Sequence, residues 1–531
     1  MTHQKRLNFR LLSLSSAATV ALAMSTVTTP AGAQQVAPAP VAPAAAPAPV
    51  APAAAAAPVA PAPAPEPAAP PAATTPELAP LPPPPPLTPE PVAPPLVAAP
   101  GDAKVAEAPL DDLVAVKGKW SPVLYGFVEF DSIRDSTQSF NDLAGNGNIA
   151  RNGTYAAEHA RTTFGVRNSR LGFKLTAPTI GEVKTSGVLE MDFLGNQPSP
   201  ITEAGFFNNP TFRIRHFAMK IEDPYVDVLI GQYWQLFGWQ SSFHPNTVEI
   251  QGVPGQVYSR AAQVRLSHRF KTDAVDFEIA AAAARPPQRD AATPDGQAGL
   301  RLFVNKWKGM HTAGGTGSAV DSLSVGVSGV LRHFGVPPFT GSGTGKEIQK
   351  NGTGISVDAL VPVIPATTES KANAITLTGS YVTGTGISDL YTGLTGGVAF
   401  PSLPNPTNAS PAPTYTSDLD AGLAQFDGNG NLHTIDWQSY IVGIQYYLPP
   451  SGKLWVSANY SHMKSDNAKD YTPTSSQSKV FVKSEWADVN LFWDAVPAVR
   501  LGAEYAFFKQ TYADGKEGKN GRLQFSAFYL F

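Results

Sequence analysis

Basic side chains recur at alternating positions in several short segments of the sequence. They are Arg170, Lys174, Arg213, Arg215, Arg265 and Arg269. Their neighbours are mainly apolar, as Leu171 and Phe173 are beside Arg170. Because alternate residues of a β-strand point to opposite faces, the basic side chains are expected to share one face and the apolar side chains the other. Clustered guanidinium groups on a water-facing surface attract anions, so this pattern predicts a basic wall beside water.

The end of the chain shows the alternation most clearly. One face carries Leu523, Phe525, Ala527, Tyr529 and Phe531, and the other carries Arg522, Gln524, Ser526 and Phe528. Segments of about ten residues with this pattern are typical of transmembrane β-barrel strands, which meet lipid on one face and water on the other. A Lys or Arg on the lipid face at mid-membrane costs ~2–4 kcal/mol, which enforces the alternation. The terminal aromatic residues Phe525, Tyr529 and Phe531 resemble an assembly signal, so we expect the barrel assembly machinery to be a partner.

The same pattern predicts sixteen strands. They are expected near residues 122–131, 163–176, 182–194, 211–221, 225–236, 259–270, 274–284, 299–307, 321–333, 354–364, 372–383, 435–447, 453–463, 479–493, 498–509 and 520–531. Short connections alternate with long ones, and the longest, 384–434, holds about fifty residues, an asymmetry typical of outer-membrane barrels. The fold class is therefore all-β, a transmembrane antiparallel barrel.

Two segments fit the pattern less well. Pro362 cannot donate a ladder hydrogen bond and belongs at an edge or a bulge. The connection 308–320 is longer than a periplasmic turn usually is. Fourteen or eighteen strands therefore remain alternatives to sixteen.

The first 33 residues read as a secretory signal peptide. Lys5, Arg6 and Arg10 precede an apolar stretch at 11–24, and small residues precede Gln34. This order of charge, apolar run and small residues is the mark of a cleaved signal, predicted here to be cut after Ala33. A membrane anchor is the alternative, but the apolar stretch falls short of the ~20 residues that a spanning helix needs.

Residues 34–120 read as a Pro/Ala-rich periplasmic linker that precedes a barrel domain at 121–531. Between residues 36 and 100, 25 positions are proline and 24 are alanine. These residues offer too little apolar surface to offset the ordering of the chain, so we expect disorder. An extended proline-rich path rises ~3.1 Å per residue, so this segment could reach on the order of 200 Å. It is expected to act as a spacer, with contact to the cell wall as the alternative.

Composition excludes several other functions. The chain of 531 residues has no cysteine, so disulfide scaffolds, zinc–thiolate sites and thiol nucleophiles are excluded. Its net charge of -3 lacks the basic excess typical of nucleic-acid binding. The nine histidines are dispersed without metal-ligand spacing. We therefore expect no cofactor, no metal and no nucleic-acid partner.

Two pairs of segments resemble the Gram-negative general porins. Residues 169–174 with 187–192 are similar to their second and third strands, and 213–220 with 228–232 to their fourth and fifth. The charged arms and the run 225–239 are closer to the DcaP-like branch. The resemblance covers residues 121–270 and implies a 16-stranded trimeric channel whose third external loop folds inward. The sequence departs from the pattern in its Pro/Ala tract, which replaces an expected helical segment, and in lacking a Pro-Glu-Phe-Gly motif.

The third external loop would be the segment between the strands at 225–236 and 259–270. It contains His244, Asn246, Glu249 and Gln251. We expect Glu249 to face the basic wall and to set a field across the pore. A surface loop with one scattered acid is the alternative. For the arginines themselves, bracing by Glu190 and Asp192 is the alternative to lining the solute path.

These features favour a water-filled porin that lets small hydrophilic solutes, preferably anions, diffuse across the bacterial outer membrane. The lipid bilayer and lipopolysaccharide would surround it, and the resemblance implies a homotrimer. An outer-membrane hydrolase is disfavoured because no local nucleophile signature is found, so we predict no enzymatic activity. A structural or adhesive protein that tethers the membrane to the cell wall through its Pro/Ala arm is the alternative function.

Overall fold

The computed structural model describes residues 119–139, 143–144, 149–196, 210–288, 291–313, 317–336, 347–367, 369–392, 419–420, 422–427, 431–472 and 474–531. All of them belong to one unit, Ala103–Phe531. The predicted signal peptide, 1–33, and nearly all of the predicted linker, 34–120, lie outside the described residues.

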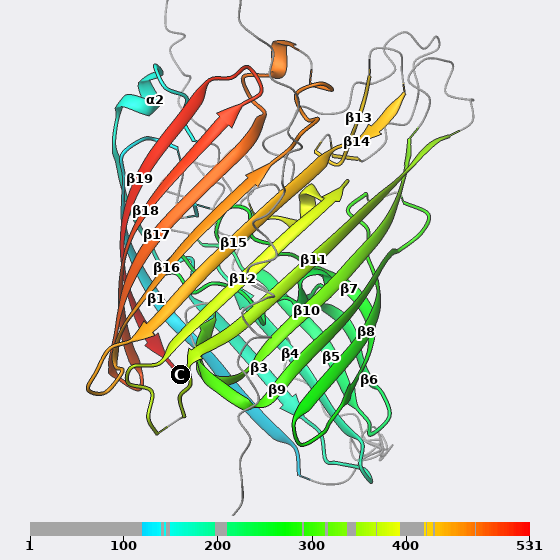
Figure 1. Cartoon of the computed structure of the whole chain (residues 1–531), viewed down its shortest axis with the longest axis vertical. Helices are drawn as coiled ribbons and strands as arrows, with labels where there is room; N and C mark the ends of the chain where they lie inside the picture. The colour runs from blue at the N-terminus through cyan, green and yellow to red at the C-terminus, as the bar shows by residue number, and fades with distance from the viewer. Residues whose placement is uncertain are drawn as a thin grey trace, which may run out of the picture. The chain divides into compact units, whose positions relative to one another are not determined.

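The described chain forms a closed antiparallel barrel (Figure 1). Its strands are β1 (Ser121–Asp135), β2 (Arg161–Gly165), β3 (Arg170–Thr176), β4 (Lys184–Asp192), β5 (Arg213–Glu222), β6 (Asp227–Trp234), β7 (Arg260–Phe270), β8 (Val275–Ala284), β9 (Asp295–Ala313), β10 (Gly317–Val336), β11 (Ile348–Ile364), β12 (Ile375–Thr385), β15 (Asp436–Tyr447), β16 (Leu454–Lys464), β17 (Phe481–Val496), β18 (Val499–Tyr512) and β19 (Glu517–Leu530). Both β2 and β3 pair with β1, so they are two parts of one strand. The barrel therefore has sixteen strands, as the alternation predicts.

Short elements decorate one end of the barrel (Figure 1). The helix α2 (Tyr155–Glu158) follows β1, and a small hairpin of β13 (Ala424–Phe426) and β14 (Leu432–Thr434) lies in the long connection after β12. Three 3-10 turns are also present, η2 (Phe237–Trp239) in the connection between β6 and β7, η3 (Ser388–Leu390) after β12 and η4 (Thr474–Ser476) between β16 and β17. Among the described residues, no helix is long and apolar enough to span a membrane.

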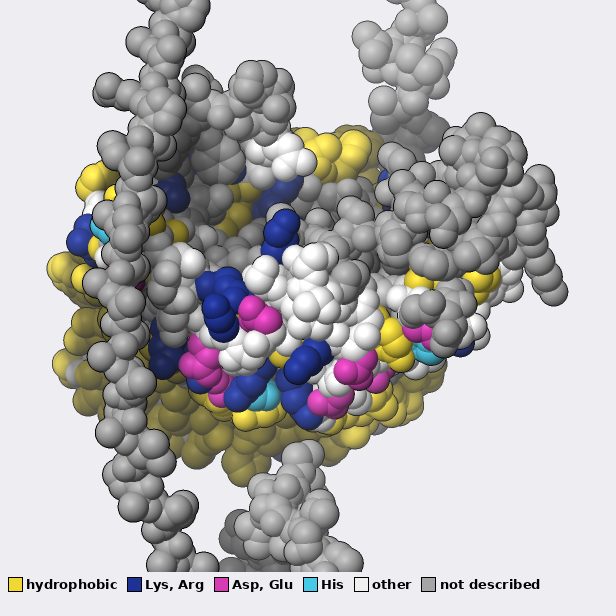
Figure 2. Space-filling model, turned by 90° about the horizontal axis from the view of Figure 1, so that it is seen from above, with side chains coloured by type: hydrophobic (Ala, Val, Ile, Leu, Met, Phe, Trp, Pro, Cys, Tyr) yellow, Lys and Arg dark blue, Asp and Glu magenta, His cyan; other side chains and the backbone are white. Residues whose placement is uncertain are grey.

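The alternation of the last strand is confirmed by burial. Phe525 and Tyr529 are exposed on the outer side of β19, whereas Gln524 and Ser526 are buried on the inner side. The barrel closes where β19 pairs with β1, and the last residue, Phe531, exchanges backbone hydrogen bonds with Gly126. Figure 2 shows apolar side chains along the visible outer side of the wall. Such an outer band is what contact with lipid requires.

A bulge corrects the expected alternation of β5. Beyond Arg215, Phe217 and Met219 fall on the arginine face if the period of two is kept. In the structure the β4–β5 register shifts at Glu190/Met191, so that Glu190 is opposite His216 and Met191 is opposite Ile214. A bulge places two residues against one on the partner strand. Arg215 and His216 are consequently both buried, and Phe217 is exposed.

The segment 308–320, expected to be a long turn, is mostly strand. β9 continues to Ala313 and β10 begins at Gly317. Pro362 is near the end of β11, next to a register shift between β11 and β12, which is where a residue without an N–H is tolerated. Neither segment changes the strand count.

Candidate functional site: the constriction

The connection between β6 and β7, residues 235–259, folds into the barrel and is called here the constriction loop. Its start is anchored on β9 and β10: Gln297 Oε1 accepts from the Phe237 N–H at 2.9 Å, and Ser328 Oγ accepts from the Gly238 N–H at 2.8 Å. Its middle contacts other strands, because Ser457 Oγ of β16 donates to the Asn246 carbonyl at 2.6 Å. The loop therefore crosses the lumen and narrows it.

Two glycines make room for the first anchor. Trp239 donates from Nε1 to the Val327 carbonyl at 3.1 Å. Its ring lies directly over Gly299 of β9 and Gly326 of β10, where an added Cβ would come within 2.8 Å and 2.7 Å of the ring. No larger side chain fits there without displacing the indole, so these glycines hold the loop in place.

Replacing Gly326 by valine is expected to displace Trp239 and loosen the constriction loop. The single-channel conductance should increase, because a loosened loop blocks less of the lumen. The matched control is Gly329→Val in the same strand, since the nearest atom to a Cβ there is the Gly354 carbonyl oxygen at 3.5 Å, an ordinary contact. Equal conductance in the two variants would show that Trp239 does not position the loop.

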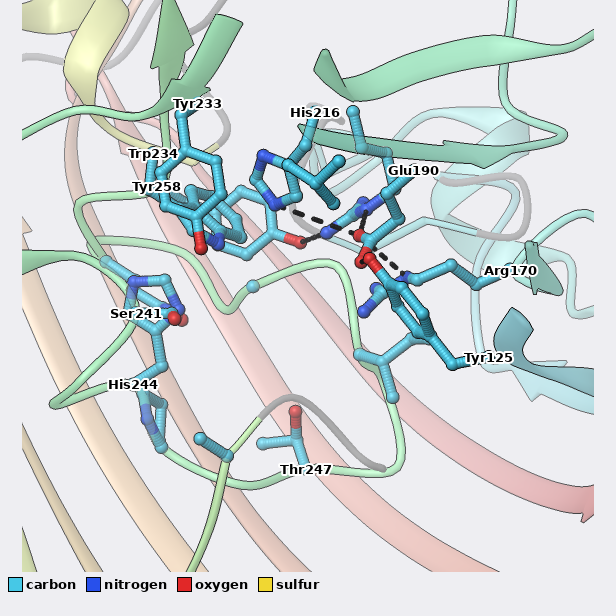
Figure 3. A pocket seen from close by; sticks show the side chains of 17 residues that line it. Tyr125, Arg170, Glu190, His216, Tyr233, Trp234, Ser241, His244, Thr247 and Tyr258 are labelled. Atoms are coloured by element: carbon cyan, nitrogen blue, oxygen red, sulfur yellow. Dashed lines mark hydrogen bonds and ion pairs between the residues drawn. The ribbon is translucent and has the colours of Figure 1, made fainter. Parts of the chain in front are cut away.

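The predicted basic residues occupy several places on the wall. Arg170 and Arg215 line a cavity of about 240 Å³ beside the constriction loop (Figure 3), called cavity 1. Lys174 and Arg265 line a second cavity of about 380 Å³, cavity 2, nearer the short turns. Arg269 lines a third of about 480 Å³, cavity 3. The structure thus spreads the predicted wall along the lumen.

In cavity 1 the arginines meet two carboxylates. Arg215 is buried and donates to Glu190 at 2.8 Å and to Asp192 at 2.9 Å. Arg213 contacts Asp192 at 2.6 Å, and Arg170 approaches Glu190 at 3.5 Å. The bracing expected as the alternative is therefore present, although Arg170 and Arg215 also contribute to the lining of cavity 1.

Aromatic rings surround the same carboxylates. Tyr125 donates to Glu190 at 3.1 Å, and Tyr258 accepts from Arg215 at 3.2 Å. The guanidinium groups of Arg215 and Arg260 lie 5.7 Å and 4.9 Å from the centroid of the Trp234 ring. Cations near an aromatic face are attracted by its negative charge, which helps to hold the arginines together.

Arg260 is a residue of the constriction that the sequence pattern does not predict. Its position in β7 places it on the apolar face, so alternation argues against a role. Within the described residues it forms no ion pair, and its buried Nη1 has no hydrogen-bond partner. Three guanidinium groups, those of Arg170, Arg213 and Arg215, share the carboxylates of Glu190 and Asp192, and the guanidinium group of Arg260 lies nearby over the Trp234 ring. The constriction keeps a net positive charge on this side.

The predicted residues of the constriction loop divide between its two sides. His244 lines cavity 1 and contacts Trp234 and Tyr258, and burial lowers its pKa to about 3. Gln251 accepts from Arg213 and Arg215, each at 3.1 Å. Asn246 instead contacts β16 through its carbonyl.

Glu249 lies elsewhere than expected. Its carboxylate is fully buried and faces Arg522 of β19 at 3.5 Å, and its N–H donates to Glu504 of β18 at 3.0 Å. Burial raises its pKa to about 8, with Arg522 acting in the opposite direction and Glu504 adding to the rise. It therefore does not face the arginine wall, because the loop docks this side chain against Arg522 of β19 and Glu504 of β18.

The wall formed by β1, β17 and β18 is acidic but covered. Glu129, Asp131, Asp488 and Glu504 point inward from β1, β17 and β18, and all four are buried. The constriction loop lies over this wall: Val248 donates to Asn490 at 2.8 Å, beside Asp488, and Glu249 to Glu504. The acids are buried beneath the loop, whereas Lys174 and Arg265 line cavity 2 and form no ion pair among the described residues.

An external segment holds the other end of the constriction loop. The Tyr258 N–H donates to the Leu390 carbonyl at 2.9 Å, and the Thr392 N–H donates to the Gln256 carbonyl at 2.8 Å. This segment is tied to the wall by Arg332 of β10, which is buried and binds both Asp295 and Asp389. The loop is thus fixed at both ends.

Solved structures of outer-membrane proteins match this chain along most of its length. The outer-membrane channel DcaP of Acinetobacter baumannii matches with a TM-score of 0.54 and 18% identity, over 78% of this chain and 99% of that one. An anion-selective porin from Comamonas acidovorans matches with a TM-score of 0.43 and 12% identity, over 78% and 100% of the chains. No family model and no curated protein matches the sequence. The chain has the fold of the outer-membrane porins, of the DcaP-like kind.

Proposed function

We propose that the protein is a passive channel that lets small hydrophilic solutes, preferably anions, cross the outer membrane. The observation that carries this proposal is the charge on the solute path. At the constriction, Arg170, Arg213 and Arg215 share two carboxylates and Arg260 lies beside them, whereas the acids of β1, β17 and β18 are buried beneath the loop. An excess of fixed positive charge in a narrow aqueous passage raises the local concentration of anions.

Cavity 2 extends this charge along the lumen. Lys174, Lys220 and Arg265 line it together with Asp227 and Glu278. Lys220 lies 3.8 Å from Asp227, and Glu278 pairs with Arg301. Within the described residues Lys174 and Arg265 form no ion pair, so their charge is available to a passing anion.

The first test is recording from purified protein in a planar lipid bilayer. We expect ohmic single channels, and under a KCl gradient a reversal potential whose sign corresponds to chloride preference. A reversal potential of the opposite sign would contradict the anion preference while leaving the channel intact. Absence of conductance from correctly folded protein would contradict the channel itself.

The proposal includes the arrangement of the whole chain. Residues 1–33 would be removed as a signal peptide, residues 34–120 would form a periplasmic arm, and the barrel would be a homotrimer. The trimer is tested by comparing the gel mobility of heated and unheated samples, because an intact trimer migrates more slowly than the separated chains. Tethering to the cell wall predicts that the full chain sediments with peptidoglycan and that a chain lacking residues 36–100 does not.

A further inference from the structure

The ends of β9 and β10 leave the line of the barrel wall. Their pairing shifts register between Ser322 and Leu323: Leu323 is opposite Val304, whereas Ser322 is opposite Lys308. Three residues of β9, 305–307, are therefore extra, and an insertion of this kind bends a strand pair. Beyond the bend, pairing continues from Lys308 to Ala313 on one strand and from Gly317 to Ser322 on the other. We call residues 308–313 and 317–322 the inner hairpin.

The inner hairpin lies against the lumen side of β11, β12 and β15. Thr376 of β12 donates to the Met310 carbonyl at 2.6 Å. Thr312 donates from its N–H to Gln445 of β15 at 3.0 Å and accepts at its carbonyl from the same amide at 2.8 Å. Gln445 and Thr376 are buried, whereas their neighbours Ile444 and Leu377 are exposed on the outer side. The hairpin is therefore inside the barrel.

The hairpin meets the constriction loop there. Met310 belongs to one buried apolar cluster with Val248 of the constriction loop and with Tyr447, Trp455 and Phe492 of the wall. Met310, His311 and Thr312 are themselves buried. Burial of this kind holds the hairpin in a fixed position, because removing large apolar side chains from water is favourable.

The two elements border the same passage. Ser241 of the constriction loop and Ala313 of the inner hairpin line both cavity 1 and cavity 3. Cavity 3 is lined further by Arg269 and Arg301 on the wall and by His311 and Asp321, which lie 3.0 Å apart on the hairpin. A solute that leaves cavity 1 toward cavity 3 has to pass between loop and hairpin.

We propose that the inner hairpin is a second constriction element, so that hairpin and constriction loop together set the size limit of the channel. Ala313 is the residue that fixes the width on the hairpin side. This inference rests on the proposed channel function, because only a conducting pore has a size limit.

The first experiment removes the hairpin. Lys308 and Ser322 are opposite each other, so residues 309–321 can be replaced by Asn-Gly, which closes such a pair in a tight turn. Single-channel conductance in KCl is expected to rise by about twofold or more, since the narrowest part of a pore limits conduction. Neutral polyethylene glycols of graded size should enter the shortened channel at larger diameters than they enter the wild type.

A second variant keeps the experiment decisive if the shortened chain does not fold. Ala313→Trp is expected to lower conductance by about half, because a bulky side chain fills the passage. The matched control is Ala281→Trp, which adds the same ring on the exposed outer side of β8 and should leave conductance unchanged. If Ala313→Trp and the control both conduct as the wild type does, the inference about the hairpin is wrong, whereas the proposed channel function still holds. Failure of the wild type to conduct would instead overturn the proposed function.

Discussion

Replacing Arg332 by methionine is expected to lower the free energy of unfolding by about 3–5 kcal/mol, the cost of removing one partner from a buried ion pair. Arg332 binds Asp295 at 2.7 Å, and the side chains of both residues are 1% exposed. In the described residues Asp295 has no other hydrogen-bond donor to its side chain. The substitution would therefore leave a buried carboxylate without compensation.

The measurement is equilibrium unfolding in guanidinium chloride, followed by tryptophan fluorescence. Arg269→Met is the matched control, because its side chain is 36% exposed and Asp276 keeps bonds from Thr272 and Asn305. Its expected cost is below about 1 kcal/mol. Arg332→Met combined with Asp295→Asn should recover part of the loss, since the second change removes the stranded charge. Equal stability of Arg332→Met and the control would contradict the argument.

Replacing Lys174 and Arg265 together by glutamine is expected to reduce the preference for anions by about threefold to fivefold at low salt. Each unit charge ~8 Å from a passing ion in water contributes ~0.5 kcal/mol, and two such charges act here. Both residues line cavity 2 and have no ion pair among the described residues. Their removal changes the charge of the path without stranding a carboxylate.

The measurement is the reversal potential under a KCl gradient at several salt concentrations. The control variant replaces Lys469 and Lys479 by glutamine, because both are exposed in the external connection between β16 and β17. It changes the net charge of the protein by the same amount. A reversal potential that shifts equally in both variants would assign the effect to overall charge rather than to cavity 2.

The strands could be predicted from the sequence because lipid imposes a strict rule on them. An apolar side chain must appear at every second position wherever the wall meets the membrane. The pattern of Leu523, Phe525 and Tyr529 is therefore enough to predict a membrane-spanning strand. The bulge at Arg215 breaks that rule locally. The sequence shows only the result of this bulge, which is that the apolar positions shift by one residue before Phe217.

The constriction could be predicted only in part. The place of the loop follows from the order of strands, and His244 and Gln251 lie on its arginine side. The position of the Glu249 side chain depends on its contact with Arg522, which is 273 residues away in the chain. The positions of Arg260 and of the inner hairpin likewise depend on tertiary contacts. No local periodicity contains such long-range pairings, and alternation even assigns Arg260 to the wrong face.

The burial of the acidic wall links two properties that are usually considered separately. The constriction loop limits the size of a solute and also insulates Glu129, Asp131 and Glu504 from it. Any change that moves the loop away from this wall should widen the channel and at the same time expose negative charge, so the wider pore would favour cations. Selection for larger solutes would thus act against anion preference, unless new basic residues arose on β1, β17 or β18.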